Sequence, residues 1–119
     1  MLLVVANNQE LTVADGAPSV IYTDPFPLNG MDRATAILDV ESIWGTGSAK
    51  LVSYAAQVTN DGTNWVAVSA LADSASATGL KTKADITVYG ALIRFQLAMT
   101  TDGGLAGALF DLHVELDKA

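Results

Sequence analysis

The sequence predicts an all-β protein, an antiparallel β-sandwich with jelly-roll or immunoglobulin-like connectivity. Apolar and polar residues alternate with a period of two in residues 92–100 and 108–116, as in strands with one buried face. The pair Asp61 and Gly62 separates two apolar segments, which indicates a hairpin. Seven to nine such segments are expected along the chain, with no helical period between them.

The first expected elements lie before residue 28. Residues 2–6 and 11–14 have the character of two short strands around a polar turn at 7–10, and residues 19–23 that of a third strand. Pro25 and Pro27 follow. Because proline has no backbone N–H to donate, we expect no ladder pairing in this segment.

The middle of the chain predicts one long strand, a hairpin and a loop. Residues 34–44 alternate, and Asp39 and Glu41 share the outer face. Residues 51–59 and 65–69 form the two arms of the hairpin. Residues 70–79 are rich in Ala and Ser, which favours a surface loop over a helix. The inner face of the long strand is predicted to carry Ala36, Leu38, Val40 and Trp44.

The last third of the chain predicts the core most clearly. Residues 84–89 resemble a strand, and the two segments at 92–100 and 108–116 alternate without interruption. Their apolar side chains occupy every second position, so each set faces one side of a strand. The inward side chains are predicted to be Ile93, Phe95, Leu97 and Met99, and then Phe110, Leu112, Val114 and Leu116.

Length and composition restrict the classes of function. The chain has 119 residues, which suits a single domain over residues 1–119. Its net charge is −7, with six scattered basic residues, which argues against binding to nucleic acid or anionic membranes. Absence of cysteine excludes disulfides and thiolate catalysis. The apolar start lacks a basic leader and is too short for a signal peptide, so we expect synthesis in the host cytoplasm.

One stretch carries a family resemblance. Residues 57–65, Gln-Val-Thr-Asn-Asp-Gly-Thr-Asn-Trp, and 90–95, Gly-Ala-Leu-Ile-Arg-Phe, resemble the second half of discoidin-like (F5/8 type C, galactose-binding-like) β-sandwich modules, of the kind also seen in bacteriophage virion proteins. The resemblance implies that Asp61 and Gly62 form a turn, that Trp65 packs at the sandwich edge and that Arg94 lies on a late strand. The family is usually longer and often has a disulfide, so the resemblance supports the fold more than glycan binding.

No catalytic, cofactor-binding or metal-binding residues are predicted. His113 is the only histidine, with Asp111 and Glu115 two residues away on the same strand face. Side chains at this spacing are about 6.6 Å apart, too far for one ion without other ligands. The chain has no G-x-S-x-G elbow. Three further carboxylates, expected in loops, lack the Asp-x-Asp-x-Asp spacing of a calcium loop and favour turn formation: Asp61, Asp73 and Asp102.

These observations predict a non-enzymatic structural protein of a bacteriophage or prophage particle, such as a head decoration, cementing or minor capsid protein. It would bind copies of itself and a larger protein shell, and would reside in the virion. The apolar run at the start needs cover on both faces, and a terminal strand is easily placed at a sheet edge. The expected assembly contacts are Leu2, Leu3, Val4, Val5 and Phe26.

The alternative is a small discoidin-like carbohydrate-binding module. In this hypothesis Trp44, which ends its strand beside Gly45, is exposed and stacks on a sugar ring. Trp65 follows the Asp61–Gly62 turn as a strand residue, which favours packing over ligand binding. An exposed Trp44 with polar neighbours would favour the module, whereas an apolar edge strand at residues 2–5 would favour assembly.

Overall fold

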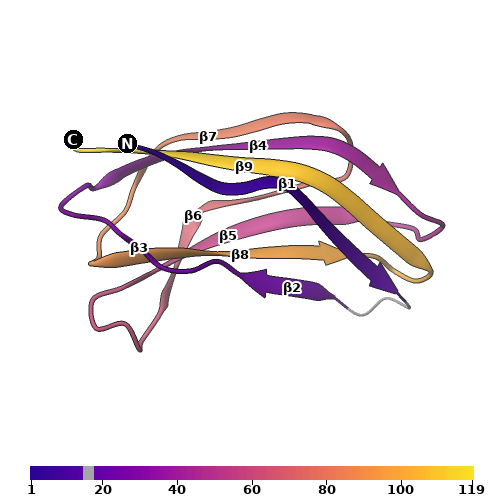
Figure 1. The fold of residues 1–119 in the computed structure, drawn as a ribbon, viewed down its shortest axis with the longest axis horizontal. Coiled ribbons are helices and arrows are strands. Elements are labelled where there is room, and N and C mark those ends of the chain that lie inside the picture. Colours follow the sequence, from indigo (N-terminus) through magenta and orange to yellow (C-terminus); the bar gives the residue numbers. More distant parts are fainter. Residues whose placement is uncertain (15–17) are drawn as a thin grey trace.

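The computed structural model describes residues 1–14 and 18–119, and two antiparallel sheets face each other in it (Figure 1). Sheet A has the order β1-β9-β4-β7, and sheet B has the order β2-β8-β5-β6, with the short β3 also paired to β8. The strands described are β1 (Leu2–Ala14), β2 (Ser19–Tyr22), β3 (Phe26–Pro27), β4 (Arg33–Trp44), β5 (Leu51–Thr59), β6 (Val66–Ala75), β7 (Gly79–Thr87), β8 (Leu92–Thr100) and β9 (Leu105–Asp117).

The strand order is that of a jelly roll. Since β2 and β3 both pair with β8, they act as one interrupted strand. The chain then pairs from its ends inward: β1 with β9, β2 and β3 with β8, β4 with β7, and β5 with β6. This arrangement of two packed sheets is the double Greek key of jelly rolls. The predicted sandwich is confirmed, with the jelly-roll connectivity.

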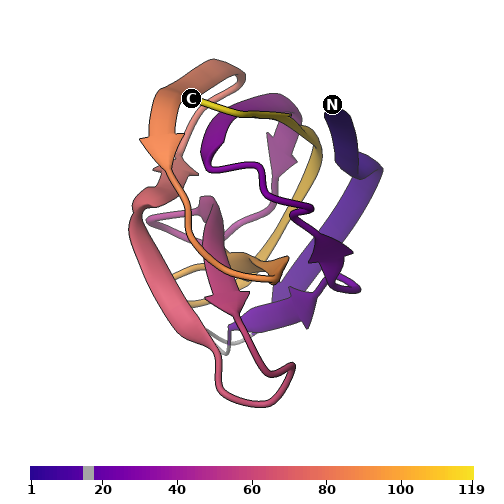
Figure 2. The same ribbon diagram turned by 90° about the vertical axis from the view of Figure 1, so that its left-hand side faces the viewer.

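The core lies between the two sheets, and the predicted alternation is confirmed in β8 and β9. The sandwich is seen from one end in Figure 2, with its strands around this interior. In the hairpin arm β5, Tyr54 and its neighbours at every second position are also buried. The eight inward side chains expected from β8 and β9 are all buried: Ile93, Phe95, Leu97, Met99, Phe110, Leu112, Val114 and Leu116.

The polar segment at residues 7–10 is not a turn, as the sequence predicted, but part of β1. The register between β1 and β9 shifts between Val4 and Ala6 and again between Ala6 and Gln9. Such bulges take up extra residues without ending a strand. Asn8 adopts a positive φ of 50°, and its N–H donates to Oδ1 of Asp111 at 2.6 Å. The prediction of two strands was therefore wrong.

The prediction that the proline segment does not pair was also wrong. Phe26 pairs with Ile93 and Pro27 with Leu92, which makes the short β3. Proline is tolerated here because it can occupy an edge position, where no N–H is needed for a second neighbour. Phe26 is partly buried against the core and Leu28 is fully buried. The segment covers the core of its own chain.

The Ala- and Ser-rich segment 70–79, predicted as a loop, consists largely of strand. It continues β6 to Ala75, and β7 begins at Gly79. The register between β5 and β6 jumps where Ala55 pairs with Ala72 but Ala56 pairs with Val68. Because of this irregularity, the apolar residues of β6 do not recur at every second position along the strand. Leu71, inside the predicted loop, is fully buried.

Candidate functional site

Three exposed aliphatic side chains lie on the outer face of sheet A, around His113. In the register of the sheet, Val4 on β1 lies opposite His113 on β9, and His113 lies opposite Ile37 on β4. Leu2 is two residues before Val4 and therefore shares its face. The exposed fractions are 57% for Leu2, 53% for Val4 and 40% for Ile37. We call these three residues the Val4 patch.

The Val4 patch reaches the edge of the sheet, because β1 is the outermost strand of sheet A. Of the expected assembly contacts, only Leu2 and Val4 are exposed. Leu3 is buried, and Val5 and Phe26 are partly buried against the core. Alternation along β1 explains this, since successive side chains point to opposite faces.

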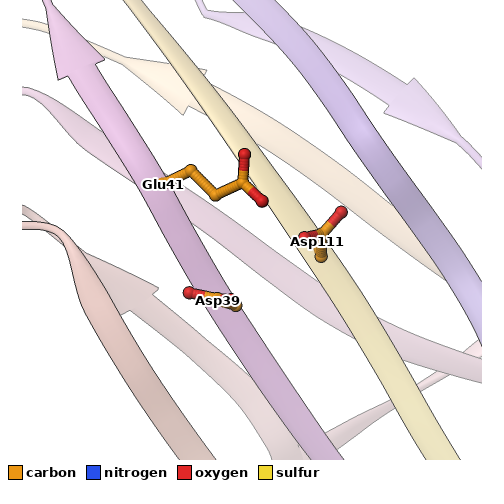
Figure 3. Close-up of side chains that lie close together, drawn as sticks. All are labelled: Asp39, Glu41 and Asp111. Atoms are coloured by element: carbon orange, nitrogen blue, oxygen red, sulfur yellow. The ribbon is translucent and has the colours of Figure 1, made fainter.

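Three carboxylates lie close together on β4 and β9 (Figure 3). Asp39 on β4 pairs directly with Asp111 on β9, and the bulge between Val40 and Ser42 brings in Glu41. Ligand oxygens of the three residues lie within 4.8 Å of one another. The pKa of Glu41 is raised by a hydrogen bond with Asp111, by desolvation, and by the negative charges of Asp111 and Asp39.

This cluster was not predicted, because its three carboxylates come from two strands, β4 and β9, that are far apart in the sequence. The alternation of residues 34–44 predicted that Asp39 and Glu41 share the outer face. The sequence did not show that this strand pairs with β9, which carries Asp111. The cluster could contact a cation through oxygen ligands. Exposed acidic groups are common without an ion, and the cluster by itself defines no metal site.

Asp61 and Gly62 lie in a loop, residues 60–65, that joins β5 to β6. Gly62 has a φ of 79°, as expected for this position. Oδ1 of Asp61 accepts hydrogen bonds from the N–H groups of Thr63 and Asn64, both at 2.8 Å, and from the Thr59 hydroxyl at 2.9 Å. These bonds hold the pKa of the Asp61 carboxyl well below its ordinary value.

Trp65 is the last residue of this loop, directly before β6, and it stacks on Arg94 of β8. The guanidinium carbon of Arg94 lies 4.2 Å from the ring centroid of Trp65 and 4.6 Å from that of Tyr22 on β2. Nε of Arg94 donates to the Gln57 side chain at 2.7 Å. The arginine thus joins three strands of sheet B on its outer face through cation–π contacts and a hydrogen bond.

Trp44 does not point inward with Ala36 and Leu38, as the sequence predicted. The bulge before Ser42 changes the face of the strand end, and Trp44 is 40% exposed. Its indole covers Gly107 on β9, where an added Cβ would lie 2.5–2.6 Å from ring atoms. Trp44 borders a groove of about 240 Å³ that is also lined by Thr12, Val13, Gly45, Thr46, Leu105 and Ala106.

The structure is similar to solved β-sandwich proteins at low sequence identity. It matches TmCBM61 in complex with β-1,4-galactotriose with a TM-score of 0.55 and 12% identity, over 91% of this chain and 69% of that one. It matches the infectious bursal disease virus VP2 subviral particle with a TM-score of 0.58 and 8% identity, over 99% of this chain. The chain spans only 32% of that capsid protein.

These likenesses establish the fold, a β-sandwich of the kind present in carbohydrate-binding modules and virus capsid proteins. A second infectious bursal disease virus structure, of the T13 particle, gives a TM-score of 0.58 at 11% identity over 99% of this chain and 30% of that one. No family model matches the chain. No curated protein matches it significantly. Among the described residues, no helix is long and apolar enough to cross a membrane.

Proposed function

We propose that this chain is a non-enzymatic structural protein of a bacteriophage or prophage particle that acts by protein–protein assembly. The observation that carries the proposal is the Val4 patch, in which two exposed aliphatic side chains lie on the edge strand β1 and a third lies on β4 of the same sheet. These side chains lie beside the free edge of β1, and an edge strand offers backbone groups for pairing with a further chain.

The fold and the composition support the same function. A jelly roll that matches almost the whole chain occurs in a virus capsid protein, so the architecture is compatible with a shell. The net charge of −7 keeps separate copies soluble before they assemble. We infer that copies of this chain meet through sheet A, and that the complete assembly contacts a larger protein shell.

The test is the mass of the protein in solution, measured by sedimentation for the wild type and Val4→Lys. The side chain of Val4 is half exposed, so the lysine is tolerated in the monomer but cannot enter an apolar contact. We expect multimers for the wild type and a shift to monomers for V4K. Val20→Lys is the matched control, because Val20 is 42% exposed on β2 of the other sheet.

Multimers that survive V4K, or that dissociate equally in V20K, would exclude the Val4 patch as the contact. Phe26 is a poorer test position. It is packed against the core, so a change there would alter folding together with assembly.

Carbohydrate binding is the second candidate, and the observation that favours it is the exposed Trp44 beside its groove. One face of the indole covers Gly107, which leaves the other face for stacking on a sugar ring. The probe is β-1,4-galactotriose, the ligand in the TmCBM61 complex. If Trp44 is a binding residue, titration quenches tryptophan fluorescence in the wild type and not in Trp44→Ala.

A further inference from the structure

The outer face of sheet B carries a single charged side chain on its described strands, Arg94, although the chain has a net charge of −7. Its outward residues are those that alternate with the buried ones along each strand. We call this surface the Arg94 face; it includes Val20, Tyr22, Arg94, Gln96, Ala98, Ser53, Ala55, Gln57, Ala67, Ala72 and Ser74.

The one carboxylate on the described strands of sheet B, Asp73, does not share the Arg94 face. It lies opposite Tyr54 in the register, and Tyr54 is buried in the core, so both side chains are on the inner side of the sheet. Oδ1 of Asp73 lies 3.9 Å from Nζ of Lys81. Asp24 lies between β2 and β3, and neither of the two ion pairs formed by the described residues involves Asp24 or Arg94.

Three contacts fix the guanidinium of Arg94. Its central carbon lies over the rings of Trp65 and Tyr22, and its Nε donates to Gln57. Within the part of the chain that the structure describes, this is the only hydrogen bond of the side chain, so the four N–H groups of the two terminal nitrogens stay free. A ligand therefore meets a donor group that is already ordered, which lowers the entropic cost of binding.

The chemistry of these donors selects a carboxylate as the ligand. The planar N–H groups of a guanidinium match the two oxygens of a carboxylate or a phosphate in a bidentate pair. Nucleic acids and anionic membranes carry many charges, and a protein of net charge −7 with one cation on this face repels them. A single aspartate or glutamate of another protein brings only one charge to Arg94.

The surroundings of Arg94 suit a protein segment and not a free carboxylate ion. Val20 and Tyr22 are 42% and 52% exposed and offer apolar area beside the arginine. Beyond β8, the rows of the sheet that contain them continue with the short side chains of Ser53 and Ala55, above which a second backbone can approach closely. Tyrosine, tryptophan and arginine are also the residue types that dominate binding at protein interfaces.

We propose that the Arg94 face docks a segment of another protein that presents one aspartate or glutamate between apolar residues. The carboxylate accepts the terminal N–H groups of Arg94, and the apolar neighbours pack on Tyr22 and Val20. This inference rests on the proposed function, because it assigns the contact with the larger shell to sheet B and leaves sheet A for contacts between copies.

The experiment is a titration followed in ¹H–¹⁵N spectra, with the capped peptide acetyl-Val-Glu-Val-amide as the probe. It is expected to shift the Nε–H signal of Arg94 and the indole N–H signal of Trp65. The neutral counterpart, acetyl-Val-Gln-Val-amide, is expected to bind roughly tenfold more weakly, because it offers no charge-assisted pair.

Two variants at Arg94 and one control test the contact. Arg94→Ala is expected to weaken binding of the glutamate peptide by roughly tenfold or more, and Arg94→Lys by about threefold, because lysine keeps the charge and loses the planar fork. Thermal melts check that both variants fold, and R94K decides the question if R94A does not. Lys118→Ala is the matched control, since it removes one positive charge at an exposed position after β9.

Four outcomes would overturn the proposal: the glutamate peptide shifts neither signal, the glutamine peptide binds equally well, the folded variants at Arg94 bind as tightly as the wild type, or inorganic phosphate binds at Arg94 more tightly than the peptide. The last result would make the arginine a general anion site.

Sedimentation separates this proposal from the proposed function. R94A is expected to keep the wild-type mass distribution, and V4K is expected to bind the glutamate peptide as the wild type does. A loss of multimers in R94A would make a second copy of this chain the occupant of the Arg94 face and would overturn the proposal. Peptide binding by a strictly monomeric wild type would support the Arg94 face while contradicting assembly through the Val4 patch.

Discussion

At the scale of single residues, Asp61 organises the loop between β5 and β6. Its carboxylate accepts four hydrogen bonds, all of which favour the ionised form and lower its pKa from the ordinary 3.8. A lowered pKa in the folded state stabilises the protein above the ordinary pKa. This contribution is lost as the pH falls through the lowered value.

Asp61→Asn is therefore expected to melt below the wild type at neutral pH, and the difference should shrink on acidification. The amide of the variant does not titrate, whereas the wild type begins to lose its advantage below pH 3.8 and loses more as the pH approaches the lowered pKa. Thermal melts of both proteins from about pH 7 to about pH 2 measure this. A melting difference that stays constant, or that grows in acid, would contradict the role given to the carboxylate.

Gly62 supplies the second requirement of the same loop. Its φ is 79°, and an added Cβ would have no heavy atom within 4 Å. Gly62→Val is therefore penalised by backbone conformation and not by a clash, and should cost about 1–2 kcal/mol of folding free energy. Gly62→Asn should cost less, because asparagine tolerates a positive φ. Equal denaturation midpoints for glycine and valine would show that the loop rearranges without penalty.

At the scale of strands, the bulges explain where sequence reasoning succeeded and failed. β8 has no bulge, and its predicted bounds and buried face are those of the structure. β1, β4 and β6 each contain register shifts. A bulge moves the following side chains to the opposite face, which is why Trp44 was predicted to point inward and why residues 70–79 resembled a loop.

The strand assignment of β6 can be tested at Leu71. This side chain is fully buried, while Leu80 on β7 is 69% exposed. Leu71→Ala is expected to destabilise the fold by about 2–5 kcal/mol, and the matched Leu80→Ala by less than about 0.5 kcal/mol. Chemical denaturation measures both. Similar midpoints for L71A and L80A would restore the predicted surface loop.

At the scale of the whole molecule, the sequence predicts the sandwich but not its surfaces. The period of two in β8 and β9 and the absence of a helical period are local properties of the chain, and both hold. The Val4 patch, the acidic cluster and the Arg94 face each combine residues far apart in the chain. The Val4 patch and the acidic cluster form only because β1 and β4 both pair with β9. The register of that pairing cannot be read from a single sequence.

If copies of this chain assemble through sheet A, hydrogen–deuterium exchange at low and high protein concentration detects the contact at β1. Assembly over the Val4 patch and the edge of β1 should slow the exchange of β1 amides as concentration rises, because a second chain covers that edge. The amides of β2 and β6, the edge strands of sheet B, should exchange at the same rate throughout. Exchange in β1 that is independent of concentration would contradict assembly through sheet A.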